Sequence, residues 1–135
     1  MIRYVIDASA AVEYLLRTPL GLKLADAVED AFLLAPELLD VEVLSVLRRA
    51  VLRQQLEEPR AALVLEDLIE WPVERIAHVS LVQEARRHHH NVGAYDAFYV
   101  AVARLYDATL LTADGPLTRT PAPGITVQNI QMKKR

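Results

Sequence analysis

The stretch YVIDASAAVEYLL, residues 4–16, decides the fold class because it joins a strand to a helix through one acidic residue. Residues 4–6 are β-branched or aromatic, which predicts a short, covered strand. Residues 8–16 are rich in Ala and Leu, which favours a helix. Asp7 stands between the two. An Asp at such a junction commonly caps the helix, but in a parallel α/β sheet it also lies at the carboxyl end of a strand, where ligands bind.

The rest of the chain repeats this alternation of short strands and helices. We predict strands at 2–6, 32–35, 73–77, 108–112 and 125–130, and helices at 9–17, 20–30, 37–55, 59–70, 80–90 and 94–106. The segments FLLA and ATLLT are continuously apolar, as strands covered on both faces are. Strands separated by helices predict a parallel sheet with helices on both sides, an α/β sandwich. No repeat or linker divides the chain, so we expect a single domain, residues 1–135.

The composition excludes several classes of protein. Apolar residues make up 53% of the 135 residues, which argues against intrinsic disorder. Cysteine is absent, so disulfides and thiolate metal sites are excluded, and a cytoplasmic location is expected. No apolar run approaches the ~18 residues of a membrane span. The net charge of −3 provides no overall basic field for nucleic acid.

Four acidic residues stand where apolar residues surround them: Asp7, Glu42, Asp96 and Asp114. Each has an ordinary structural interpretation. Asp7 can cap a helix, Glu42 can belong to a solvated stripe, Asp96 suits the dipole of a first helical turn, and Asp114 begins an Asp-Gly turn. Tyr99, three residues after Asp96, is counted with the apolar face of that helix.

Together these four acids occupy two strand ends and two helix faces of one predicted sheet, a geometry that can gather carboxylates in one crevice. Oxygen ligands without cysteine or a suitable histidine pair favour a hard cation, Mg²⁺ or Mn²⁺. Such a cation can polarise a phosphodiester and activate water. Without a cation, clustered acids raise one another's pKa. A chemical use of the cluster is therefore favoured.

Other charged residues carry weaker signals. Arg49 and Arg53 continue the helix face of Glu42, at a place where they could contact phosphate. The consecutive histidines 88–90 look like a metal site, but they point in different directions on a helix and we see no partner for them at helical spacing, so a metal role is not favoured. The pattern predicts that three further acids are ordinary surface residues: Asp26, Asp40 and Asp107.

Four segments, VIDASA, PELLDVEVLSVLRR, AYDAFYVAVA and LLTADGPL, resemble in order and spacing the motifs of PIN-domain nucleases, and most of all the VapC-type toxins of toxin–antitoxin pairs. The resemblance implies a PIN-like α/β/α sandwich and a Mg²⁺- or Mn²⁺-dependent endoribonuclease that uses activated water. Cleavage would leave a 5′-phosphate and a 3′-hydroxyl. A homodimer and inhibition by a small VapB-like antitoxin are implied as well.

The resemblance also carries the family's site residues onto this chain. The acids fall on Asp7, Glu42, Asp96 and Asp114, and Asp7 and Asp96 would hold the metal directly. Supporting hydroxyls fall on Ser9 and Thr112. One departure is visible, because Ser45 stands where many relatives have Asn, which puts a helper contact in doubt but none of the acids.

Other functions remain open. A PIN-like nuclease could process RNA without being a toxin, and a PIN-like module could bind a partner without catalysis. A phosphoacceptor aspartate would also end a strand, but the dehalogenase type expects a second Asp where this chain has Ser9. The receiver type expects a Lys beyond a later strand, and the strand end at ATLLTADG offers none.

Overall fold

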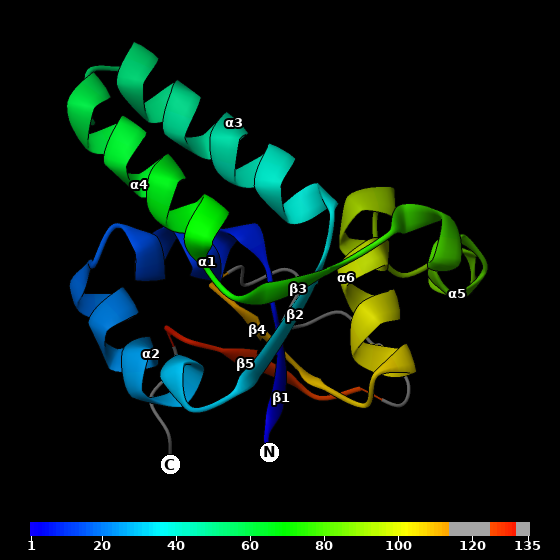
Figure 1. Cartoon of the computed structure of the whole chain (residues 1–135). Helices are drawn as coiled ribbons and strands as arrows, with labels where there is room; N and C mark the ends of the chain where they lie inside the picture. Colours follow the sequence, from blue (N-terminus) through cyan, green and yellow to red (C-terminus); the bar gives the residue numbers. More distant parts are fainter. Residues whose placement is uncertain (114–124, 132–135) are drawn as a thin grey trace.

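The computed structural model describes residues 1–113 and 125–131 and confirms the predicted parallel sheet (Figure 1). Its five strands lie in the order β3-β2-β1-β4-β5, and every neighbouring pair is parallel. Their carboxyl ends therefore share one edge of the sheet. The bounds of the strands are β1 (Arg3–Ile6), β2 (Phe32–Pro36), β3 (Val73–Ile76), β4 (Thr109–Thr112) and β5 (Val127–Asn129).

Helices cover both faces of the sheet. One face packs against α1 (Ala8–Leu15), α2 (Pro19–Glu29), α3 (Leu38–Leu52) and α4 (Glu58–Glu70). The other face packs against the helices α5 (Val82–Arg86) and α6 (Ala94–Leu105), and the 3₁₀ turn η1 (His78–Ser80) leads from β3 into α5. Helices α3 and α4 run side by side beyond the edge of the sheet (Figure 1). Within the described ranges, no helix has the length and apolar character needed to cross a membrane.

The two cores explain why the strands are continuously apolar. Ile6 and Leu111 face the core under α1, whereas their neighbours Val5 and Leu110 face the core under α6. All four side chains are almost completely buried. Because successive residues of a strand point to opposite faces, each covered face requires its own apolar residue.

Most predicted elements are present, but several predicted helix ends are wrong. Positive backbone φ angles at Arg17 (56°), Gln54 (59°) and Asp107 (50°) follow the ends of α1, α3 and α6, as left-handed residues commonly follow helix ends. The expected helix at 80–90 is instead the turn η1 followed by the short α5. After Arg86 the backbone N–H groups of 87–89 donate three residues back, which tightens the chain into turns.

Candidate active site

Asp7 lies directly after β1 at the carboxyl edge of the sheet. It is the N-cap of α1, and its Oδ1 accepts hydrogen bonds from the backbone N–H of Ala10 (3.0 Å) and from the Ser9 hydroxyl (2.7 Å). Only 5% of the side chain is exposed. The capping interpretation is therefore correct, and it coexists with an unusual burial of this carboxyl group at the place where α/β sheets bind ligands.

Two hydroxyl groups join Asp7 to the neighbouring strand. The Ser9 hydroxyl accepts a hydrogen bond from the backbone N–H of Ala113 (2.8 Å) and lies 3.3 Å from the Thr112 hydroxyl. The Thr112 side chain is fully buried and also hydrogen-bonds Asp7. Both hydroxyls that the resemblance proposed as supporting groups thus lie beside this carboxylate, between the end of β4 and the first turn of α1.

Glu42 faces α6 and meets a partner that sequence reasoning missed. The Tyr99 hydroxyl donates a hydrogen bond of 2.7 Å to Glu42 Oε1, and Tyr99 is 1% exposed. Burial raises the pKa of Glu42, and the hydrogen bond from Tyr99 opposes that rise. The sequence signal for this contact is a tyrosine on an otherwise apolar helix face. A buried tyrosine hydroxyl usually requires a hydrogen-bond partner.

Asp96, in the first turn of α6, connects these groups electrostatically. Burial raises the pKa of Asp7 to about 6; hydrogen bonds from Thr112, Ala10 and Ser9 oppose the rise, and the negative charge of Asp96 adds to it. The same charge of Asp96 also raises the pKa of Glu42. The charge of Asp96 therefore affects both Asp7 and Glu42, so these three carboxyl groups lie in one neighbourhood near the carboxyl ends of the strands.

The donor set suits a hard divalent cation. All the donors are oxygen atoms, and a cation would offset the repulsion among buried carboxylates. In residues 1–113 and 125–131, no three acidic or histidine side chains by themselves form a group that could hold a metal ion. Mg²⁺ commonly uses only one or two carboxylates and keeps several waters, so a site with few protein ligands suits such an ion. The predicted fourth acid, Asp114, lies outside the described residues.

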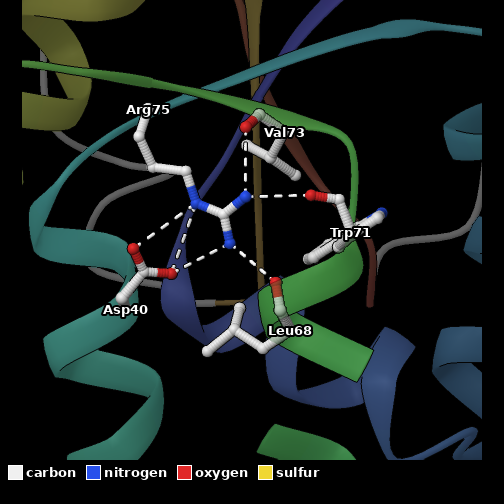
Figure 2. Close-up of polar contacts among 5 residues, drawn as sticks. All are labelled: Asp40, Leu68, Trp71, Val73 and Arg75. Atoms are coloured by element: carbon white, nitrogen blue, oxygen red, sulfur yellow. Dashed lines mark hydrogen bonds and ion pairs between the residues drawn. The ribbon is translucent and has the colours of Figure 1, made fainter. Parts of the chain in front are cut away.

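The remaining candidates fall at different places. Arg49 and Arg53 are exposed, on and just after α3. Asp40 lies at the surface as predicted, with 44% of its side chain exposed, but its Oδ1 also lies 3.0 Å from the Arg75 guanidinium. The same guanidinium donates to backbone carbonyls at the end of α4 (Figure 2). The expectation that the histidines lack a partner at helical spacing is wrong for His88, whose Nε2 lies 3.0 Å from Glu84, four residues earlier.

The fold and the site together define an α/β/α protein with an acidic, oxygen-rich site at the carboxyl edge of a parallel sheet. The sequence matches the PIN domain family over residues 4–123, and the chain belongs to that family. The resemblance found in the four motifs is thereby confirmed.

Two curated relatives from Mycobacterium tuberculosis are similar to nearly the whole chain. Ribonuclease VapC12 is 34% identical over 116 residues, covering 86% of this chain and 90% of the relative. Ribonuclease VapC1 is 37% identical over 119 residues, covering 87% of this chain and 90% of the relative.

Solved structures show the same fold. PAE2754 from Pyrobaculum aerophilum superposes with a TM-score of 0.65 at 20% identity, over 93% of this chain and 83% of that one. A chain in the structure of VapBC2 from Rickettsia felis bound to a promoter DNA fragment superposes with a TM-score of 0.58 at 17% identity, over 95% and 98%.

Proposed function

We propose that this chain is a Mg²⁺- or Mn²⁺-dependent endoribonuclease and the toxin of a VapBC-type toxin–antitoxin pair. The observation that carries the proposal is the buried carboxyl group of Asp7 at the end of β1, whose pKa is raised by its burial and by the nearby charge of Asp96, which also raises the pKa of Glu42. Support comes from relatives named as VapC ribonucleases, which are similar to this chain over 86% and 87% of its length.

The proposed roles follow from the contacts. Asp7 and Asp96 hold the cation, with Ser9 and Thr112 fixing the orientation of the Asp7 carboxylate. Glu42, oriented by Tyr99, supplies a third negative charge beside them. Asp114 remains a fourth acid predicted from sequence. When bound, the divalent cation supplies Lewis-acid chemistry, polarising the phosphodiester and activating water.

The proposed partners are RNA, a second copy of the chain and a small VapB-like antitoxin. Arg49 and Arg53 are the proposed RNA contacts, because they are exposed on the helix that presents Glu42 and their guanidinium groups suit phosphate oxygens. The antitoxin proposal rests on the relatives and on the VapBC2 complex of R. felis.

The test is RNA cleavage by the purified chain. We expect a single-stranded RNA to be cleaved at internal positions with Mg²⁺ or Mn²⁺ and to remain intact with EDTA. Asp96→Asn retains the shape of the side chain and removes the charge that a hard cation requires. It should therefore fold like the wild type and cleave at least a hundredfold more slowly.

Two results would overturn the proposal. One is cleavage in EDTA at the rate seen with metal, which would exclude a divalent cation. The other is cleavage by Asp96→Asn at nearly the wild-type rate, which would remove the assigned site. A folded wild-type chain that cleaves no RNA under any of these conditions would favour the non-catalytic interaction module.

A further inference from the structure

The start of α3 is capped by a side chain from another part of the chain. One residue, Glu37, separates β2 from α3, and at the N-cap position it makes no side-chain hydrogen bond to the helix. Instead, the backbone N–H of Leu38 donates to Nε2 of His78, at 2.8 Å. A helix start leaves several N–H groups without intrahelical partners, and an imidazole from η1 satisfies one of them here. Since Nε2 accepts this bond, the neutral ring carries its proton on Nδ1.

Further hydrogen bonds hold the two segments together. The backbone N–H of His78 donates to Glu37 Oε1 (3.3 Å), and the backbone N–H of Glu37 donates to the carbonyl of Ile76 (3.1 Å). Each segment therefore donates to and accepts from the other. The position at which α3 begins is fixed by the chain that follows β3.

The other side of His78 faces α6. The ring of His78 contacts Phe98, with centroids 5.0 Å apart and planes inclined by 52°. The residue after Phe98 is Tyr99, whose hydroxyl holds Glu42. On α3, Leu38 and Glu42 are four residues apart and so lie one turn apart on the same side of the helix. Tyr99 thus joins α6 to α3 directly through Glu42, and Phe98 joins α6 to the start of α3 through His78, which accepts from Leu38.

We propose that His78 is a positioning residue that holds the start of α3 against α6 and so keeps Glu42 in place relative to Asp96. The proposal rests on the function proposed above, because those acids are its site. His78 itself need not touch RNA or metal. The hydrogen-bond acceptor at Nε2 is the decisive feature, since it sets where the first turn of α3 begins and thereby where Glu42 projects.

Three substitutions of His78 distinguish the effect of its hydrogen-bond acceptor, Nε2, from the effect of its aromatic ring. His78→Gln can place an amide oxygen near the position of Nε2, His78→Phe retains an aromatic ring against Phe98 without an acceptor, and His78→Ala removes both. We expect kcat for RNA cleavage to fall at least tenfold in His78→Phe and His78→Ala, with KM within twofold of the wild type. His78→Gln should recover kcat to within about threefold. Ser80→Ala is the matched control, because Ser80 lies in the same turn and its hydroxyl donates to the backbone carbonyl of Ala77.

A purely structural role gives a different result. If kcat below the melting temperature is the same in the Gln and Phe variants, or follows only the fraction of folded protein, the proposal is wrong. Circular dichroism identifies the folded fraction, so the Gln and Phe variants decide the matter even if His78→Ala does not fold.

A second measurement does not depend on nuclease activity. We expect His78→Phe and Tyr99→Phe to have non-additive effects on Tm, because each weakens the same junction between α3 and α6. Additive effects would overturn the positioning role. If the wild-type chain cleaves no RNA, the proposed function fails, whereas non-additive Tm values would still show that His78 and Tyr99 share one junction.

Discussion

Asp7 shows how one side chain can serve both the fold and the site. Its oxygen Oδ1 caps α1, yet burial raises its pKa to about 6, so the folded protein disfavours the charge that a metal ligand needs. A carboxyl group whose pKa is raised by folding stabilises the folded state below its unfolded pKa, here 3.8. That contribution is lost as the pH rises to about 6 and above. The loss amounts to about 3 kcal/mol at neutral pH, from 1.36 kcal/mol per pKa unit.

Asp7→Asn should therefore melt no lower than the wild type in EDTA at pH 7, and the advantage of the variant should disappear as the pH falls toward 4. Asn caps a helix about as well as Asp, so the cap itself is retained. Adding Mn²⁺ should reverse the order, because a ligand that binds only the folded state stabilises it by about 2.7 kcal/mol at 100 times its Kd. Thermal melts with and without metal test both effects.

The control for this experiment is Asp26→Asn, which removes the same charge from an exposed position on α2. We expect its Tm to follow the wild type in EDTA and in Mn²⁺. If Mn²⁺ raises the Tm of Asp7→Asn as much as that of the wild type, Asp7 is not a ligand.

Asp7 could be selected from the sequence because its neighbours in the chain indicate its position, with a strand before it and a helix after it. The partnership of Tyr99 with Glu42 could not be reached in this way, since 57 residues separate the two. Only the tertiary fold, which places the Tyr99 hydroxyl of α6 against Glu42 of α3, brings them together. The capping of α3 by His78 could not be predicted for the same reason, because Leu38 and His78 are 40 positions apart.

At the scale of elements, the strands could be predicted because burial on both faces requires continuous apolar residues. The helix ends could not, because they depend on single backbone angles and on caps supplied from elsewhere. Arg75 is a further example: a residue on β3 donates to the carbonyls of Leu68 and Trp71, at the end of α4, and pairs with Asp40 in α3 (Figure 2).

Arg75→Met should lower the free energy of unfolding by about 2 kcal/mol, because it leaves Asp40 and several carbonyl groups without their donor. Urea denaturation gives this value directly. Arg87→Met is the matched control, since Arg87 is 72% exposed and its nitrogen lies 3.8 Å from the Glu84 carboxylate. The control should change stability by no more than about 0.5 kcal/mol. Equal effects in the two variants would show that the junction of α3, β3 and α4 does not depend on Arg75.

The exposed arginines of α3 can be tested by the salt dependence of RNA binding. Replacing Arg49 and Arg53 with Ala, in an Asp96→Asn background that leaves RNA uncut, should weaken binding and reduce the slope of log K against log salt by about 1.4. This follows from about 0.7 per phosphate contact on a single strand. Replacing Arg48 and Arg104 removes the same charge from exposed positions outside that face and should change the slope less. An unchanged slope in the Arg49 and Arg53 variant would mean that these residues form part of a solvated stripe and do not contact RNA.

At the scale of the whole molecule, no single motif identifies the family, whereas the order of all four does. Each acid taken alone has an ordinary structural explanation, and for Asp7 that explanation is also true. The topology favours a shared role for these acids. A parallel sheet places the ends of β1 and β4 and the starts of α1, α3 and α6 at one edge. The order and spacing of the four motifs therefore predict both the fold and the position of the proposed acidic site.

The proposed toxin role concerns the whole chain acting in a cell. Expressed alone in a bacterial host, the wild type should arrest growth within a few generations, because an endoribonuclease without its antitoxin degrades RNA that the cell requires. Asp96→Asn, produced to the same level, should leave growth unchanged, since it should retain the fold and loses the charge with which Asp96 is proposed to bind the cation. Growth curves together with immunoblots of both proteins measure this difference. If the wild type cleaves RNA in vitro but is harmless at high expression, the chain is an RNA-processing nuclease. Arrest by both proteins alike would mean that the toxicity does not come from cleavage at this site.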